Sequence, residues 1–183
     1  INEDSLYNFL PESEDASGDT LNFIVTNKPD WANFNTATGL LSGTPDNNDV
    51  GITKGIVISV SDGISTVNLD SFDLEVNNTN DHPVIISDST AASGSIFEDA
   101  VLNTVSGLLM ASDVDTGDNL TFSVENPTGT YGSLAITEAG RWVYTLDNND
   151  IDTNALAEGV TETDVIEVTV TDIQGATASE NVV

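Results

Sequence analysis

Short runs in which apolar and polar residues alternate recur along the chain and predict β-strands. Leu21, Phe23 and Val25 alternate with polar neighbours, and the segment 56–60 has the same pattern. Alternation at every second residue is typical of a strand with one face on a core. Turns rich in Gly, Asp, Asn and Ser separate these runs. The pattern therefore predicts an all-β protein.

A predicted hairpin and a tryptophan in a loop add to this prediction. Residues 132–146 form a predicted β-hairpin that turns at 138–140, with Trp142 and Tyr144 on one face of its second strand. We expect this face to pack on a core. Trp31 lies in a loop and is expected to close one end of a sandwich, with ligand stacking as the alternative.

The two halves of the chain resemble each other. GDTLNFIV at 18–25 matches GDNLTFSV at 117–124, and the two glycines are 99 residues apart. A Glu-Asp pair precedes each copy, at 3–4 and 98–99. A repeat of about 100 residues built of short alternating strands indicates tandem immunoglobulin-like sandwiches. We expect one domain at 1–80 and a second at 81–183.

The charge of the chain restricts its partners. Three Lys and Arg residues stand against 31 Asp and Glu residues, which gives a formal charge of −28. Such a chain is repelled by nucleic acid phosphates and by anionic membranes. A compact acidic body also repels itself. Either a solvated acidic surface suited to high salt or bound multivalent cations would relieve this repulsion.

The chain contains no cysteine, so it can form neither disulfides nor thiolate metal sites. Metal binding is then the expected substitute for disulfide stabilisation in a secreted protein. No apolar run approaches the roughly 20 residues that span a bilayer, so we expect no membrane insertion. The sequence does not open on a basic segment followed by an apolar run, and it begins and ends within its repeat pattern, so we expect it to be an excerpt of a longer protein.

Aspartates at turn spacing suggest where a cation would bind. Asp113, Asp115 and Asp118 lie in the loop DVDTGD, and Asp15 and Asp19 lie in the weaker counterpart DASGD, in which Ser17 replaces the middle carboxylate. Calcium takes six to eight hard oxygen ligands, and carboxylates in a turn supply them. The amide-rich stretch NNTNDHPV at 77–84 separates the two halves and offers further oxygens.

The first half resembles the dystroglycan-type cadherin-like domain, which is related to the putative-Ig family. The resemblance rests on residues 15–23, on PDWANFNTATGLLSGTP at 29–45, and on 60–63 and 78–84. The second half resembles the VCBS repeat of large bacterial adhesins through ASDVDTGDNLTFSV, YGSLAITEAGRWVYTLDN, ALAEG and VTVTD. Together these resemblances cover nearly the whole chain. They imply two tandem immunoglobulin/cadherin-like Greek-key β-sandwiches joined by a short calcium-binding linker.

The resemblance also implies that calcium (Ca2+) stiffens the junction between domains. Cadherin linkers read DxNDN, and here Asn78 replaces the first carboxylate while His82 replaces the last amide. The ligands implied at this junction are Glu3 or Asp4, Asn78, Asn80, Asp81, Asp113, Asp115 and Asp172, with Asp118 and Asp49 as further candidates. The residues that would face a preceding domain are Asp15, Asp19 and Asp62.

These features together predict a secreted or cell-surface module of a large bacterial surface protein. Its expected partners are calcium and neighbouring domains of the same long chain. A calcium-dependent module that binds polysaccharide or a homotypic partner is the alternative, with Trp31, Tyr131 and Trp142 as candidate sugar-stacking residues. No nucleophile–His–acid set or phosphate-cradling glycine loop is present, so the sequence favours a non-enzymatic protein.

Overall fold

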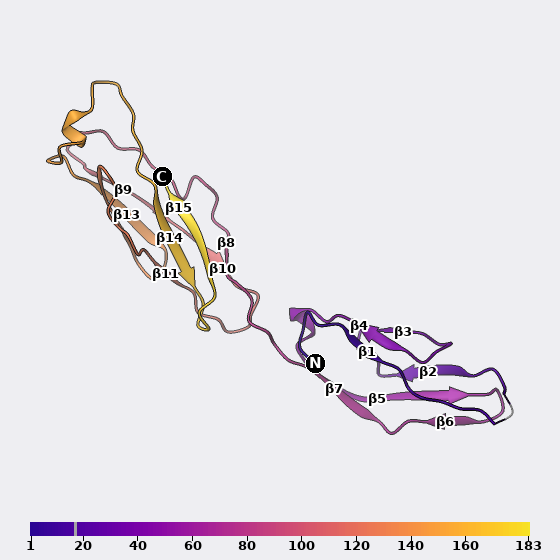
Figure 1. Ribbon diagram of the computed structural model, residues 1–183. Helices are drawn as coiled ribbons and strands as arrows, with labels where there is room; N and C mark the ends of the chain where they lie inside the picture. The colour runs from indigo at the N-terminus through magenta and orange to yellow at the C-terminus, as the bar shows by residue number, and fades with distance from the viewer. Residues whose placement is uncertain (17) are drawn as a thin grey trace. The chain divides into compact units, whose positions relative to one another are not determined.

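A computed structural model describes residues 1–16 and 18–183, so the predicted role of Ser17 lies outside the described residues. The chain forms two compact units, Ile1–Thr79 and Asn80–Val183 (Figure 1). Both units are built of β-strands, and the described residues contain only two short 3-10 helices, Asn47–Asp49 and Thr153–Ala155. The all-β prediction is confirmed. The predicted domain limits of 1–80 and 81–183 stay a prediction.

The first unit is a sandwich of two antiparallel sheets. One sheet has the order β1-β4-β3, and in the other β5 lies between β2 and the pair β6 and β7. The strands are β1 Tyr7–Phe9, β2 Asn22–Thr26, β3 Asn33–Phe34, β4 Leu41–Gly43, β5 Gly51–Ser61, β6 Thr66–Asn68 and β7 Phe72–Val76.

Alternate residues of these strands make the core of the first unit. Phe23, Leu41, Ile56, Ile58 and Leu74 are buried, and Leu41 and Ile56 are 0% exposed. Burial of each large apolar side chain stabilises the fold by about 1.5–3 kcal/mol. Strand alternation therefore predicted the inward face correctly.

The last strand of the first unit is interrupted between Asn68 and Phe72. β6 ends at Asn68 and β7 begins at Phe72, while the register shift itself lies between Thr53 and Ile56 of the partner strand β5.

The second unit contains three small antiparallel sheets. Their orders are β12-β13-β9, β11-β14-β15 and β10-β8. The strands are β8 Val84–Ile85, β9 Thr104–Leu108, β10 Ala111–Ser112, β11 Thr121–Ser123, β12 Gly132–Ile136, β13 Arg141–Leu146, β14 Ile166–Thr171 and β15 Thr177–Val182.

Trp142 is the largest side chain in the core of the second unit and is 1% exposed. Its indole N–H donates a hydrogen bond to the carbonyl of Ala91 at 2.8 Å. Gly107 lies against the indole, because a Cβ at this position would come within 2.6 Å of the ring. The predicted hairpin with Trp142 on its core face is confirmed.

No helix in the described part of the chain is long and apolar enough to cross a membrane.

Candidate metal centre

Three carboxylates of the second unit gather at one end of its sheets. Asp113 follows β10, Asp118 precedes β11, and Asp172 directly follows β14. Because β11 and β14 run antiparallel with Thr121 opposite Thr171, the start of one strand lies beside the end of the other. One carboxylate oxygen from each of the three aspartates lies within 4.8 Å of the other two.

The loop that carries Asp113 and Asp118 is folded by its own side chains. Asp113 Oδ1 accepts a hydrogen bond from the N–H of Asp115 at 2.9 Å, and the N–H of Asp118 donates to the carbonyl of Asp115 at 3.4 Å. Gly117 has a φ of +94°, a backbone conformation that favours glycine. The loop therefore returns on itself and brings its first and last aspartates together.

Asp172 is fixed by donors on both of its carboxylate oxygens. The backbone N–H groups of Gly175 and Ala176 donate to Oδ1, and the side-chain amide of Asn80 donates to Oδ2 at 2.8 Å. Asn80 also donates to the carbonyl of Asp81. The amide of Asn80 is thereby oriented with its own oxygen away from these two acceptors.

Within the described part of the chain, three buried oxygens of this region accept no hydrogen bond. They are Asn80 Oδ1, Asp113 Oδ2 and Asp118 Oδ2. Buried polar atoms are nearly always paired, and an unpaired buried acceptor is costly. A bound cation would supply what these oxygens lack. The set is made only of carboxylate and amide oxygens, which fits a hard cation such as calcium.

The charges within this group act on one another. Burial raises the pKa of Asp118, and the nearby charges of Asp113, Asp172 and Asp115 raise it further. Burial also acts to raise the pKa of Asp172, but hydrogen bonds from Asn80 and from the backbone of Ala176 and Gly175 outweigh it and hold the pKa below its usual value. Asp172 therefore stays ionised more readily than Asp118, whose ionisation is disfavoured by burial and by the neighbouring charges.

Asp115 and Asp81 form a second contact in the same unit. Asp115 is 7% exposed, and its Oδ2 accepts a hydrogen bond from the backbone N–H of Asp81 at 2.8 Å. Asp115 thus does not belong to the group of Asp113, Asp118 and Asp172, although the loop sequence groups it with Asp113 and Asp118.

Glu3 is the most buried acidic residue of the first unit, at 1% exposure. Its Oε1 accepts a hydrogen bond from the N–H of Thr79 at 2.6 Å, while its Oε2 is buried without a donor. The neighbouring Asp4 is exposed and has a φ of +56°. Of this predicted pair, only Glu3 therefore presents a buried carboxylate.

The other predicted ligands of the first unit have different surroundings. Asp49 caps the first 3-10 helix, where its Oδ2 accepts from the N–H of Asp46. Asn78 is exposed. These observations leave the predicted ligand roles of both residues as predictions.

Asp15, Asp19 and Asp62 belong to the first unit as well. Asp15 Oδ1 accepts from the N–H of Asp19, and Asp62 Oδ1 accepts from the N–H groups of Ile64 and Ser65. Backbone hydrogen bonds from Ser65 and Ile64 hold the pKa of Asp62 below its usual value. Within residues 1–16 and 18–183, these three aspartates do not gather as Asp113, Asp118 and Asp172 do.

Sequence reasoning missed Asp164. Its carboxylate accepts hydrogen bonds from the backbone N–H groups of Thr130 and Tyr131 and from the hydroxyl of Tyr144, at 2.6–3.0 Å. Burial raises the pKa of Tyr144, and the hydrogen bond to Asp164 raises it further. A single aspartate outside any motif carries no signal in the sequence that could have revealed this contact.

The sequence profile of the bacterial cadherin-like domain family matches residues 80–183. This match covers more than half of the chain, and the chain therefore belongs to the bacterial cadherin-like domain family. The profile of the putative Ig domain matches residues 2–77, which agrees with the predicted relation of the first half to the putative-Ig family, while its dystroglycan-type resemblance stays a prediction. The VCBS resemblance of the second half stays a prediction. No curated protein matches the chain significantly.

Solved cadherin structures are similar to the chain in fold. The Drosophila N-cadherin EC1-4 fragment is 20% identical, with 94% of this chain and 43% of that one covered and a TM-score of 0.55. The mouse cadherin-23 EC22-24 fragment is 14% identical, with 94% and 55% covered and a TM-score of 0.50. The chain spans 34% of the human desmocollin-1 ectodomain, another structure that it matches. The fold is thus two tandem immunoglobulin/cadherin-like Greek-key β-sandwiches.

Proposed function

We propose that the chain is an extracellular calcium-binding module of a large bacterial surface protein, and that calcium stiffens the connection between successive domains. The observation that carries this proposal is the set of buried acceptors without donors, Asn80 Oδ1, Asp113 Oδ2 and Asp118 Oδ2, beside the charged Asp172. Family membership and the absence of disulfides agree with it.

The mechanism is electrostatic. Without a cation, Asp113, Asp118 and Asp172 repel one another across less than 4.8 Å, in a chain that already carries a formal charge of −28. Like charges at this separation disfavour the folded loop. Asp113, Asp118, Asp172 and Asn80 would hold a calcium ion, which neutralises two charges and satisfies the unpaired oxygens.

The covalent connection between the units is where we propose that stiffening acts. Thr79 is tied to the first unit by its hydrogen bond to Glu3. The next two residues are tied to the second unit, Asn80 through Asp172 and Asp81 through Asp115. A cation that binds Asn80 would restrain the chain where the second unit begins, directly after Thr79.

A titration with a matched variant tests the proposal. Calcium should raise the unfolding temperature of the chain relative to its value in chelator. It should also narrow the range of molecular dimensions that small-angle scattering reports. Asp113→Ala with Asp118→Ala should abolish both responses. Asp147→Ala with Asp150→Ala removes two acidic residues from another loop of the same unit and should leave them intact.

The outcome that contradicts the proposal is a calcium response that is absent in the unaltered chain or equal in the two double variants. If calcium raises the unfolding temperature but does not change the small-angle scattering, the metal site is supported and the proposed stiffening is refuted.

Binding of polysaccharide or of a homotypic partner remains the alternative function. Trp142 is buried, and Trp31 packs edge to face on Tyr7 with ring centroids 6.0 Å apart. These two aromatic candidates thus serve in packing, and neither favours a sugar-stacking platform. Sedimentation with and without calcium checks the homotypic partner directly.

A further inference from the structure

One outer face of the second unit is formed by β12, β13 and β9 and continues into β10 and β8 (Figure 1). Between β9 and β10, Leu109 is 1% exposed, so Leu108 and Met110 on either side of it turn outward. Ile86 lies beside Met110, because its N–H donates to the carbonyl of Met110 at 2.9 Å. Val84, two residues before Ile86, turns to the same side.

Four exposed apolar side chains therefore lie together and form what we call the apolar stripe: Val84, Ile86, Leu108 and Met110, each between 45% and 58% exposed. The strands next to the stripe turn small or neutral residues outward, namely Thr104, Ser106, Ser133, Ala135, Val143 and Thr145. Arg141 lies opposite Leu108 and is the only charged residue that the described strands of this face turn outward.

The composition of this face is that of a protein interface. Met110 and Arg141 are the only methionine and the only arginine of the chain. Both residue types are enriched at interfaces, whereas Asp, Glu and Lys are depleted there. The chain contains 31 Asp and Glu residues, yet the nearest along these strands, Asp88 and Asp113, come after the ends of β8 and β10. The carboxylates thus border the face and leave its centre neutral.

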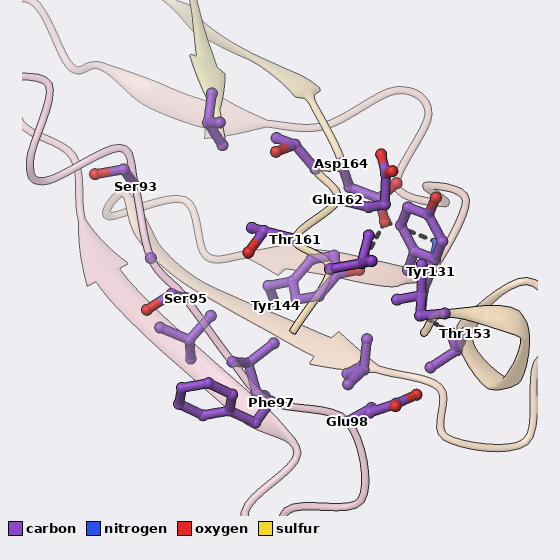
Figure 2. A pocket seen from close by; sticks show the side chains of 18 of the residues that line it. Ser93, Ser95, Phe97, Glu98, Tyr131, Tyr144, Thr153, Thr161, Glu162 and Asp164 are labelled. Atoms are coloured by element: carbon purple, nitrogen blue, oxygen red, sulfur yellow. Dashed lines mark hydrogen bonds between the residues drawn. The ribbon is translucent and has the colours of Figure 1, made fainter. Parts of the chain in front are cut away.

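A second apolar surface of the same unit has a different charge pattern. It is a cavity of about 740 Å³ beside Leu134 and Trp142. Figure 2 shows Glu98, Glu162 and Asp164 among the residues around it. These carboxylates repel an acidic partner, whereas the strands that carry the apolar stripe do not. Of the two surfaces, the stripe is the one that an acidic or neutral partner can approach.

The charge of the chain selects the partner. A basic partner is attracted to a body with a formal charge of −28 from every side and gains nothing from its neutral face. A second copy is repelled elsewhere and can approach through this face. It brings an apolar stripe of its own, and its many carboxylates outside the stripe are available to the guanidinium of Arg141.

We propose that this face pairs with the same face of a second copy, stripe against stripe, about a two-fold axis. Such a contact uses one patch on both copies and closes at the dimer. Four half-exposed side chains supply only part of the roughly 800 Å² that each partner contributes to a standard interface, so the Ser and Thr rows of β9 and β13 complete a weak contact. The pairing gives the homotypic alternative a specific surface and does not depend on the calcium site.

Sedimentation of the full 183-residue chain tests the pairing. It is run with chelator in about 1 M NaCl, where charges are screened beyond about 3 Å. The unaltered chain should pass from monomer to dimer as its concentration rises. Ile86→Glu with Met110→Glu places two charges in the stripe and should raise the dissociation constant about tenfold or more. Ile64→Glu with Ile151→Glu, at positions 92% and 80% exposed outside the face, adds the same charge and should not weaken the dimer.

A label on the face gives a measurement that does not rely on disruption. The described chain has no free cysteine, so Ser106→Cys, at an exposed position of β9, carries a single spin label. Two labels related by a two-fold axis should give one distance between copies, and this distance should appear only at concentrations at which the dimer forms. Unchanged unfolding temperatures of the variants show that each is folded.

A chain that stays monomeric at every concentration would overturn the proposal. Equal weakening by the two double variants would overturn the role of the stripe, and growth beyond two copies would overturn the two-fold contact. A monomeric chain that binds dodecanoate, with the binding lost in Ile86→Glu with Met110→Glu, would make an apolar anion the occupant instead. Because chelator is present throughout, a chain that pairs here but shows no calcium response refutes the proposed function and leaves this interface standing.

Discussion

The side-chain amide of Asn80 donates a hydrogen bond of 2.8 Å to Asp172 Oδ2, although 92 positions of sequence separate the two residues. The contact joins the start of the second unit to the end of β14. It keeps Asp172 charged and leaves Asn80 Oδ1 buried without a donor. Asn80 therefore positions Asp172, and in the proposed calcium site it would also supply a ligand oxygen.

The first prediction concerns Asn80→Ala and Asn80→Asp. Alanine removes a calcium acceptor and the donor to Asp172, so the calcium affinity should fall about tenfold, or about 1.4 kcal/mol. Aspartate adds a charge to the group and should lower the unfolding temperature in chelator while increasing the gain on calcium addition. Calorimetric titration and thermal unfolding measure these effects, and identical behaviour of both variants would rule out the two roles of Asn80.

The second prediction concerns Asp118→Asn. Because Asp113, Asp172 and Asp115 repel the Asp118 carboxylate, its neutralisation should raise the unfolding temperature in chelator. The same change removes a calcium ligand and should reduce the stabilisation by calcium. Asp147→Asn, in a different loop, is the control and should change neither value. A loss of stability in chelator would show that Asp118 is not under repulsion.

The third prediction concerns Trp142→Ala. Removing a buried tryptophan should cost about 3–5 kcal/mol and unfold the second unit at a lower temperature. Trp31→Ala, on a half-buried side chain of the first unit, should cost less and act on the other transition. Calorimetry resolves the two transitions, and a shift of the first unit by Trp142→Ala would contradict the independence of the two cores.

The fourth prediction concerns pH and Asp88. The hydroxyl of Thr90, with the N–H groups of Ala91 and Thr90, lowers the pKa of Asp88 from 3.8. A carboxyl whose pKa is lower in the folded state stabilises the fold above its unfolded pKa, and this contribution is lost as pH falls through the folded value. The unfolding temperature of Asp88→Ala should thus lie below that of the unaltered chain at pH 6.

That difference should shrink as the pH is lowered from about 4 toward 2, where both chains lose the charged interaction. Glu158→Ala, at an exposed position, serves as the comparison and should show no such convergence. A gap that widens with acidification would reverse the sign of the argument.

Much of the fold follows from local sequence signals. Strand alternation identified the inward faces of β2 and β5, and the repeat of GDxLxF at both loops indicated two related sandwiches. The DVDTGD loop correctly placed Asp113 beside Asp118, because an Asx turn and Gly117 close this loop locally. These features depend on neighbours within a few residues, which a sequence displays directly.

The remaining features depend on long-range register. The sequence groups Asp115 with its loop neighbours, but its carboxylate accepts from the N–H of Asp81, 34 positions away. The role of Asp164 depends on Thr130 and Tyr131, more than 30 positions away, which no local pattern encodes.

The apolar stripe of the second unit also bears on how this chain behaves in solution. Exposed apolar surface favours association between copies. A formal charge of −28 keeps copies apart in dilute buffer. Added salt screens this repulsion and acid removes it, so the same chain becomes a candidate for assembly under either condition. The charge of the chain therefore opposes such assembly in dilute buffer.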